Sequence, residues 1–269
     1  SDMLAQDAPA ADDNDEAARQ AELRVHYEFP PFCTGESGKL AGRPSRREIG
    51  HGALAQRSLR PVMPAFDEFS FAVRLAARTL ASNGSSSMAT VCAGSMALVM
   101  AGVPIRAPVA GISVGLLAER WPKPRPMLWQ SGDNAGDGSS GHFVHGAVSV
   151  DGADGVDGPP YGRCALLLDI QGMEDALGDM DMKVAGTRAG LTALQLDTKL
   201  PGLPLEVLTG AVALARQAHS QLLDSMDAAV ADAQSAQQAT GGGGPQHKPL
   251  KINADLVPAL VGEGGRSIE

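Results

Sequence analysis

A run of charged residues interrupts an otherwise apolar stretch of the chain. Residues 171–186 read QGMEDALGDMDMKVAG and place Asp175, Asp179, Asp181 and Lys183 among methionine, valine, alanine and glycine. If GDMDMKVAG is a β-strand, its two-residue period puts Asp179, Asp181 and Lys183 on one face and the apolar side chains on the other. Clustered carboxylates without His or Cys favour hard cations such as Mg²⁺ or Mn²⁺. The segment is therefore either a metal-carboxylate site, which Asp175 joins from the preceding turn, or an acidic surface loop.

Three consecutive serines, Ser85, Ser86 and Ser87, follow Asn83-Gly84 and open an apolar helical segment. The first turn of a helix carries unpaired N–H groups and a partial positive charge, which together attract anions. Serine hydroxyls would add further donors. Two interpretations stay open here, phosphate binding and ordinary N-capping.

A third segment, PSRREIGHGALAQRSLRP, contains Arg46 and Arg47, with His51 one helical turn after Arg47. Guanidinium groups bind phosphate through paired hydrogen bonds. Gly50 and Gly52 each cost a helix about 1 kcal/mol relative to alanine, which indicates that another backbone or a ligand comes close. The alternative is a solvated basic face. Together the three segments would supply the parts for phosphoryl transfer on a polynucleotide.

Composition is compatible with such a partner. The chain is 43% hydrophobic and 20% charged, which is typical of a soluble globular protein, and we find neither a membrane-spanning run nor a secretory signal peptide. The net charge of −9 is concentrated in residues 1–24 and 118–160, whereas residues 39–60 hold six Lys and Arg against one Glu. This local basic patch suits a polyanion. The three cysteines form no C-x-x-C pair, so a zinc site or disulfide is not expected.

The elements that must position these residues alternate between strands and helices, which predicts an α/β or α+β domain. We expect strands at 24–32, 69–84, 107–117, 163–170, 181–186 and 191–200, and helices at 44–61, 85–104 and 205–236. Ser45 and Glu48 form a capping box and Pro61 closes the first helix. We expect an acidic disordered tail at 1–23, a core domain at 24–236 with a low-complexity insertion at 118–160, a Gly-rich linker at 237–249 and a second small unit at 250–269.

Several long motifs resemble one family. FPPFCTGESGKLAGRPSRREIGHGALAQRSL, SNGSSSMATVCAGSMALVMAGVPI, VAGISVGLL and GMEDALGDMDMKVAGTRAGLTALQLDTKLPGLPLEV are similar to the second RNase PH-type core domain of polynucleotide phosphorylases (polyribonucleotide nucleotidyltransferases). LVGEGGRSI is similar to the start of the KH domain that follows it there. The resemblance spans about residues 25–235 outside the insertion. It implies an RNase PH-like fold of the ribosomal protein S5 domain 2-like type, followed by the truncated beginning of a KH domain, in a chain that we expect to be part of a longer protein.

The resemblance implies a phosphorolytic 3′→5′ exoribonuclease that acts in RNA degradation. In that reaction, inorganic phosphate attacks the last phosphodiester at a single-stranded RNA 3′ end and releases a nucleoside diphosphate, reversibly. The matching motifs imply catalytic roles for Asp175, Asp181 and Lys183, a Mg²⁺ or Mn²⁺ ion at Asp175 and Asp181, phosphate binding by Ser85, Ser86 and Ser87, and RNA binding by Arg46, Arg47, His51, Gly262 and Gly265. The resemblance also implies that the protein forms a homotrimer. We expect no membrane partner.

Two alternatives remain, an inactive RNase PH-like ring subunit that binds RNA or acts as a scaffold, and a simple KH-type RNA-binding module. Two positions depart from the family pattern, Met182 where phenylalanine is usual and Glu263 where the KH loop often has a basic residue. We expect a location in a bacterial cytoplasm or in an organelle. The low-complexity insertion and the amino-acid sequence of the serine motif favour an organelle.

Overall fold

A capping box begins the first helix, as the sequence predicts. In the computed structural model of this chain, the Ser45 hydroxyl accepts a hydrogen bond from the Glu48 N–H, and the Glu48 carboxylate accepts one from the Ser45 N–H. These bonds satisfy N–H groups that a helix end leaves unpaired, and α1 spans Arg46–Leu59. It continues as a 3₁₀ helix, η3 (Arg60–Val62), which contains the Pro61 expected to close it. The structure describes residues 22–38, 43–118, 148–150, 164–239 and 252–262.

Antiparallel strands form the main sheet, in the order β4-β5-β3-β6-β7. Their bounds are β3 (Ala110–Ala118), β4 (Val148–Val150), β5 (Cys164–Leu168), β6 (Met180–Gly186) and β7 (Leu191–Thr198). A second sheet pairs β1 (Leu23–Glu28) with β2 (Val73–Arg78) in parallel. All of these strands except β4 overlap segments that the sequence predicts to be strands.

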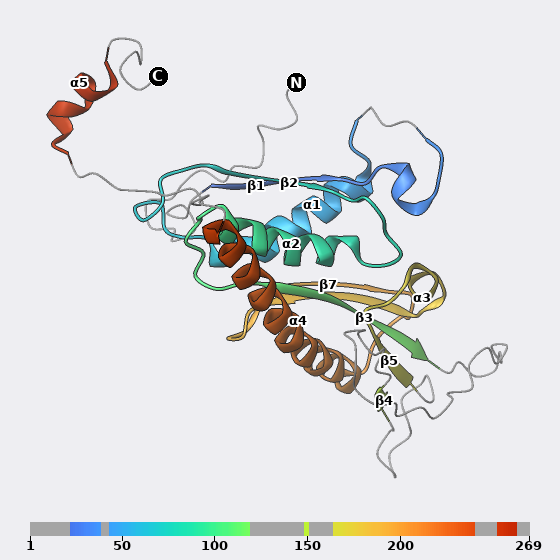
Figure 1. The fold of residues 1–269 in the computed structure, drawn as a ribbon. Coiled ribbons are helices and arrows are strands. Elements are labelled where there is room, and N and C mark those ends of the chain that lie inside the picture. The colour runs from blue at the N-terminus through green and yellow to red at the C-terminus, as the bar shows by residue number, and fades with distance from the viewer. Residues whose placement is uncertain (1–21, 39–42, 119–147, 151–163, 240–251, 263–269) are drawn as a thin grey trace.

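The long helix α4 (Leu205–Ala239) covers one face of the main sheet (Figure 1). Met180, Met182 and Val184, which alternate along β6, are buried in the core between this face and α4. Each such side chain contributes about 1.5–3 kcal/mol when it is fully buried. The expectation that the apolar face of the DMDMK segment is buried is therefore confirmed, and an acidic surface loop is excluded for this segment.

Helices α1 and α2 (Ser86–Met100) lie between the opposite face of the main sheet and the small β1-β2 sheet (Figure 1). They share one core with both sheets. Its buried members include Leu23 of β1, Leu54 and Leu59 of α1, Met88, Val91 and Leu98 of α2, and Ala185 of β6. The layers thus run small sheet, helices, main sheet, helix, which confirms the prediction of a mixed α/β domain. The polar residues of β6 face the helix layer.

One short helix was not predicted. Residues 171–178 were expected to form a turn, but α3 (Gly172–Leu177) is helical, and the Glu174 carboxylate accepts a 2.7 Å hydrogen bond from the Gln171 N–H. No residue of α3 is buried. Its apolar residues Met173 and Leu177 are four apart but exposed, and six residues are too few for a periodic pattern to predict a helix.

The expected domain boundaries shift at three points. β4 lies inside the expected insertion at 118–160 and pairs with β5, so part of that segment belongs to the sheet. α4 runs three residues into the expected linker, and β1 takes in the last residue of the expected tail. Residues 1–21, 119–147, 151–163 and 240–251 lie outside the described residues.

Three short helices complete the described chain, η2 (Pro31–Thr34), η4 (Ala254–Leu256) and α5 (Val257–Val261). Although α4 is long, neither it nor any other described helix is apolar enough over sufficient length to cross a lipid bilayer.

Candidate active site

A buried ion pair lies on the polar face of β6. The Lys183 ammonium donates a 2.5 Å hydrogen bond to Asp181 Oδ2, and both side chains are only 11% exposed. Burial raises the pKa of Asp181, the Lys183 bond and charge oppose that rise, and the charges of Asp175 and Asp197 add to it. The other carboxylate oxygen, Asp181 Oδ1, is buried and has no hydrogen-bond partner among the described residues. Since a buried carboxylate oxygen without a partner is costly, this atom has unused capacity for a ligand.

Small residues of β3 make room beside the ion pair. In the antiparallel register Gly115 pairs with Asp181 and Ser113 with Lys183, so all four residues share one face of the sheet. A Cβ atom on Gly115 would lie 2.5 Å from Ile170 Cγ2, and the Ser113 hydroxyl accepts a 3.2 Å hydrogen bond from the Ile170 N–H. The segment that leads into α3 can therefore pack directly on the face that carries the ion pair.

The serine segment forms the N-terminus of α2. Ser85 is the N-cap residue, yet its side chain makes no capping hydrogen bond. Ser86 and Ser87 are buried, and Ser85 Oγ lies 3.5 Å from Ser87 Oγ. Ordinary N-capping, one of the two interpretations that the sequence left open, is therefore not the role of Ser85. Anion binding at the positive end of this helix stays a prediction.

The serine segment and α3 lie side by side. A Cβ atom on Gly84 would lie 2.7 Å from the Ile170 carbonyl oxygen, so only glycine permits this approach. Asp175 follows one turn into α3, is exposed, and its charge acts on Asp181. The structure therefore brings the serines, Asp175 and the ion pair, which are up to 98 residues apart in the sequence, to one region of the molecule.

Tyr27, a buried residue of β1, connects this region to α1, and sequence reasoning missed it. Its hydroxyl lies 2.7 Å from Ser86 Oγ, 3.3 Å from Thr79 Oγ1 and 3.4 Å from His51 Nδ1. The one available signal was the period of β1, in which the inward positions Leu23 and Tyr27 include a side chain with a polar end. A buried tyrosine hydroxyl normally finds hydrogen-bond partners, and here the partners include two predicted site residues.

His51 extends the site toward the basic helix. Burial, and after it the charges of Lys183 and Arg47, lower the pKa of His51 to about 4, while the charge of Asp175 opposes them. Lys183 of β6 and Asp175 of α3 are thus within electrostatic range of His51. Arg47 lies with its guanidinium carbon 4.5 Å from the centre of the Phe29 ring, a cation–π arrangement. Arg47 thus packs on Phe29, and both Arg47 and Arg46, the first residue of α1, are exposed.

The two glycines of α1 have different surroundings. A Cβ atom on Gly52 would lie 3.4 Å from Tyr27 Cβ and 3.6 Å from the Val25 carbonyl oxygen, so the β1 backbone comes close, as predicted. A Cβ atom on Gly50 would meet nothing within 4 Å among the described residues. Gly52 is therefore explained by packing, and Gly50 leaves open space on the exposed side of the helix.

Asp179 is the one member of the acidic run that the structure assigns to the fold. Its side chain is fully buried, and its Oδ2 accepts a 2.9 Å hydrogen bond from the Ala118 N–H at the end of β3. Its carbonyl oxygen accepts hydrogen bonds from the Lys199 N–H and the Thr198 hydroxyl. Asp179 lies one residue before β6, and its carboxylate joins this end of the strand to the end of β3, which gives it a structural role.

A different carboxylate, Asp197, takes a place beside Asp181. It lies opposite Asp181 in the β6-β7 register, and it accepts a 2.8 Å hydrogen bond from Gln195. It is exposed, and sequence reasoning had placed it in a strand without a functional role. Only the strand register reveals its position.

The residues present fit a hard divalent cation to a limited extent. The partnerless Asp181 Oδ1 and the neighbouring charge of Asp175 suit an oxygen-binding ion. Within the described part of the chain, no three His, Cys, Asp or Glu side chains gather closely enough to hold a metal ion. Mg²⁺ usually takes one or two carboxylates and completes its shell with waters and substrate phosphates, so two carboxylates are compatible with it.

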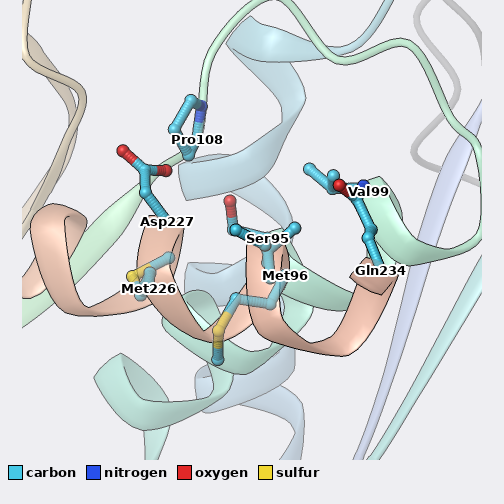
Figure 2. Close-up of a pocket in the computed structure, with 9 residues that line it drawn as sticks. Ser95, Met96, Val99, Pro108, Met226, Asp227 and Gln234 are labelled. Atoms are coloured by element: carbon cyan, nitrogen blue, oxygen red, sulfur yellow. The ribbon is translucent and has the colours of Figure 1, made fainter. Parts of the chain in front are cut away.

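Two remaining features lie apart from this site. A cavity of about 250 Å³ between α2 and α4 is lined by Met96, Val99, Met226 and Val230 among others, and by none of the predicted site residues (Figure 2). Met96 is ten residues beyond Ser86 on α2, which corresponds to about 15 Å along a helix. In the predicted KH loop, Gly262 ends α5 with a φ of 71°, and Gly265 lies outside the described residues.

Comparison with known proteins gives one family and one set of relatives. The family model for the 3′ exoribonuclease family, domain 1 (RNase PH), matches residues 4–104. That match begins upstream of residue 25, where the resemblance was expected to start. Polyribonucleotide nucleotidyltransferases of Streptococcus pneumoniae strains 70585 and JJA are each 41% identical to this chain over 244 residues. The aligned part covers 91% of this chain but 27% of each relative, so the chain spans about a quarter of the length of the curated relatives it matches.

Among solved structures, the crystal structure of rice (Oryza sativa) Rrp46 is similar, with a TM-score of 0.51 at 13% identity. The similarity covers 82% of this chain and 78% of the rice chain. At this identity the likeness concerns the fold alone.

Proposed function

We propose that this chain forms the second core domain of a phosphorolytic 3′→5′ exoribonuclease. The model for the 3′ exoribonuclease family, domain 1, matches residues 4–104, and 91% of the chain aligns with polyribonucleotide nucleotidyltransferases. Its substrates are the 3′ end of single-stranded RNA and inorganic phosphate, and its products are nucleoside diphosphates and a shortened RNA. The beginning of a KH domain at residues 250–269 stays a prediction.

One observation carries this proposal. The uncapped N-terminus of α2, with its buried serines, lies beside α3 and the face that holds the Asp181–Lys183 pair. An anion-binding helix end next to a buried lysine and a carboxylate oxygen without a partner is the arrangement that phosphoryl transfer requires. A simple RNA-binding module would need none of these features.

The chain's own residues divide the reaction between binding and positioning. Phosphate at Ser85–Ser87 would be held by serine hydroxyls and helix N–H groups, in position for in-line attack on the terminal phosphodiester. The P–O3′ bond breaks as a new P–O–P bond forms, so the terminal nucleotide leaves as a diphosphate. The proton that the attacking hydrogen phosphate carries ends on the departing 3′ oxygen. Lys183 supplies positive charge for the oxygens of the transition state, while Arg47 and His51 contact the RNA side.

Asp181 and Asp175 would hold a Mg²⁺ or Mn²⁺ ion, for which Asp181 Oδ1 offers a free buried oxygen. Such an ion, when bound, neutralises charge on the phosphoryl oxygens. It would also reverse the effect of burial, because a cation beside Asp181 lowers a carboxyl pKa that burial now raises.

The proposal is tested by shortening of poly(A) with and without inorganic phosphate. We expect phosphate-dependent shortening with release of ADP, abolished in Asp181→Ala. The Asp179→Asn variant, which keeps a hydrogen-bond acceptor for Ala118, is the matched control and should retain activity. Equal shortening without phosphate, or an unimpaired Asp181→Ala variant, would refute the proposed phosphorolysis at Asp181. No shortening under either condition would instead favour the inactive ring subunit. That alternative is not favoured while the serines and the ion pair are both in place.

The assembly and the compartment are further proposals. Homotrimer formation is tested by analytical ultracentrifugation, and a stable monomer would count against it. Location in an organelle or in a bacterial cytoplasm is tested by cell fractionation. The relatives named above are bacterial and give the organelle no support.

A further inference from the structure

The Tyr27 hydroxyl joins side chains from three other parts of the fold. It contacts Ser86 at the start of α2, Thr79 after β2 and His51 on α1, at 2.7, 3.3 and 3.4 Å. A phenol hydroxyl donates one hydrogen bond and accepts up to two. The three neighbours therefore use the whole capacity of this group, and the direction of each bond depends on the other two.

Ser86 sets the direction at one end of this chain of bonds. Under the proposed function, on which this step rests, the Ser86 hydroxyl donates its single hydrogen bond to phosphate. Its oxygen must then accept from Tyr27, which agrees with the short 2.7 Å contact. Thr79 donates to Tyr27. Because the one proton of Tyr27 is used at Ser86, the bond to His51 requires a proton on His51 Nδ1.

We propose that Tyr27 is a positioning residue that holds His51 in the neutral tautomer with its proton on Nδ1 and ties that tautomer to the phosphate site at Ser86. His51 Nε2 then presents a lone pair. Under the proposed function, Nε2 accepts a hydrogen bond from a ligand hydroxyl. That hydroxyl belongs either to the ribose of the RNA end or to a protonated oxygen of phosphate.

The surroundings of His51 agree with a neutral acceptor. The ring packs edge-on against Tyr27 at 5.4 Å between centroids, which fixes its orientation. Lys183 and Arg47 are nearby cations that already supply donors and positive charge. A third cation would be repelled by them and attracted by the Asp175 carboxylate, and the net effect favours the neutral ring. The proximity of Lys183 and Arg47 thus makes an acceptor at Nε2 complementary to its neighbours.

Nitrogen-15 NMR of the histidine rings tests this tautomer directly. The chain has six histidines, and loss of signals in His51→Gln assigns the ring of interest. We expect His51 to show a pyrrole-like Nδ1 and a pyridine-like Nε2 at pH 7. In Tyr27→Phe the bond to Nδ1 is lost, so the Nε2 signal should move toward the pyrrole-like range. Thr79→Val is the matched control, since it leaves the Ser86–Tyr27–His51 path intact and should not change the tautomer.

Ser86→Ala provides the second variant. It frees the Tyr27 proton to turn toward His51, so we expect the same movement of the Nε2 signal as in Tyr27→Phe. An unchanged signal from His219, which is buried and lies 3.0 Å from the Val184 carbonyl oxygen, shows that each variant remains folded. The proposal is overturned if wild-type His51 carries its proton on Nε2, or if neither folded variant changes the tautomer. Should Tyr27→Phe fail to fold, the Ser86→Ala result decides alone.

Additions of inorganic phosphate, an oligoribonucleotide and the matched oligodeoxyribonucleotide separate the sources of the ligand hydroxyl. A movement of the Nε2 signal with phosphate assigns the hydroxyl to phosphate, and a movement with RNA but not DNA assigns it to the ribose 2′ position. No movement with any of the three overturns the assignment of Nε2 as a ligand acceptor. Phosphate that fails to bind the chain, seen as an unchanged phosphorus-31 line, refutes the proposed phosphate site instead. The tautomers in wild type and Tyr27→Phe are still measured in that case and decide the positioning role separately.

Discussion

Replacing Asp179 with alanine should weaken the fold and leave the chemistry in place. The carboxylate of Asp179 accepts a 2.9 Å hydrogen bond from the buried Ala118 N–H and joins the end of β3 to the start of β6. Alanine leaves that N–H without a partner, and an unsatisfied buried donor costs about 1–3 kcal/mol. We therefore expect the free energy of unfolding to fall by about 2 kcal/mol. Asp179→Asn keeps an acceptor oxygen and should lose less than about 1 kcal/mol.

Urea denaturation of the wild type and both variants measures these differences. With a denaturant dependence of about 2 kcal/mol per molar urea, the midpoint of Asp179→Ala should fall by about 1 M at an unchanged slope. Phosphorolysis by Asp179→Ala should persist under conditions where the variant is folded. Stability within about 0.5 kcal/mol of wild type, as expected for an ordinary surface substitution, would refute the assigned hydrogen bond. A folded variant without activity would show that Asp179 belongs to the active site.

Three further predictions concern the neighbouring residues. Gly115→Ala places a Cβ 2.5 Å from Ile170 Cγ2 and should cost about 1–3 kcal/mol through overpacking, so an unchanged thermal midpoint would contradict the close approach. Lys183→Met leaves Asp181 buried without its cation and should cost about 3–5 kcal/mol in urea denaturation, and a second change, Asp181→Leu, should recover most of that loss. The pKa of His51 is lowered to about 4 in the folded state, below an unfolded value near 6.5. The unfolded state therefore binds the proton more tightly. His51 contributes stability above about pH 6.5, and this stability is lost as the pH falls toward 4. An NMR titration of His51 should give a midpoint near 4, and His51→Gln should lose less stability than the wild type between about pH 6.5 and 4. A midpoint near 6.5 would contradict the lowered pKa.

The parts of the fold that were predictable from the sequence depend on local rules. The capping box at Ser45 and Glu48 involves residues three apart, and both of its hydrogen bonds are present. The alternation of Met180, Met182 and Val184 predicted a strand with one buried face, and the core against α4 confirms it. Patterns of this kind are visible in sequence because side-chain direction follows directly from strand or helix geometry.

The parts that were not predictable depend on contacts between distant segments. Asp179 and Asp181 are two residues apart and look equivalent, and only the position of the Ala118 N–H separates a structural carboxylate from one with an unused oxygen. Tyr27 reaches Ser86 across 59 sequence positions and His51 across 24. No local pattern marks such a residue, because its role arises from the packing of β1 against α1 and α2.

The central claim is that phosphate held at the start of α2 is the attacking group, and the fate of isotopically labelled inorganic phosphate tests it most directly. When the protein degrades single-stranded poly(A) in labelled phosphate, we expect ADP with the label in its β-phosphate, and no labelled product from Asp181→Ala. Release of unlabelled AMP by the wild type would show that water, rather than phosphate, attacks the RNA, and would contradict the account.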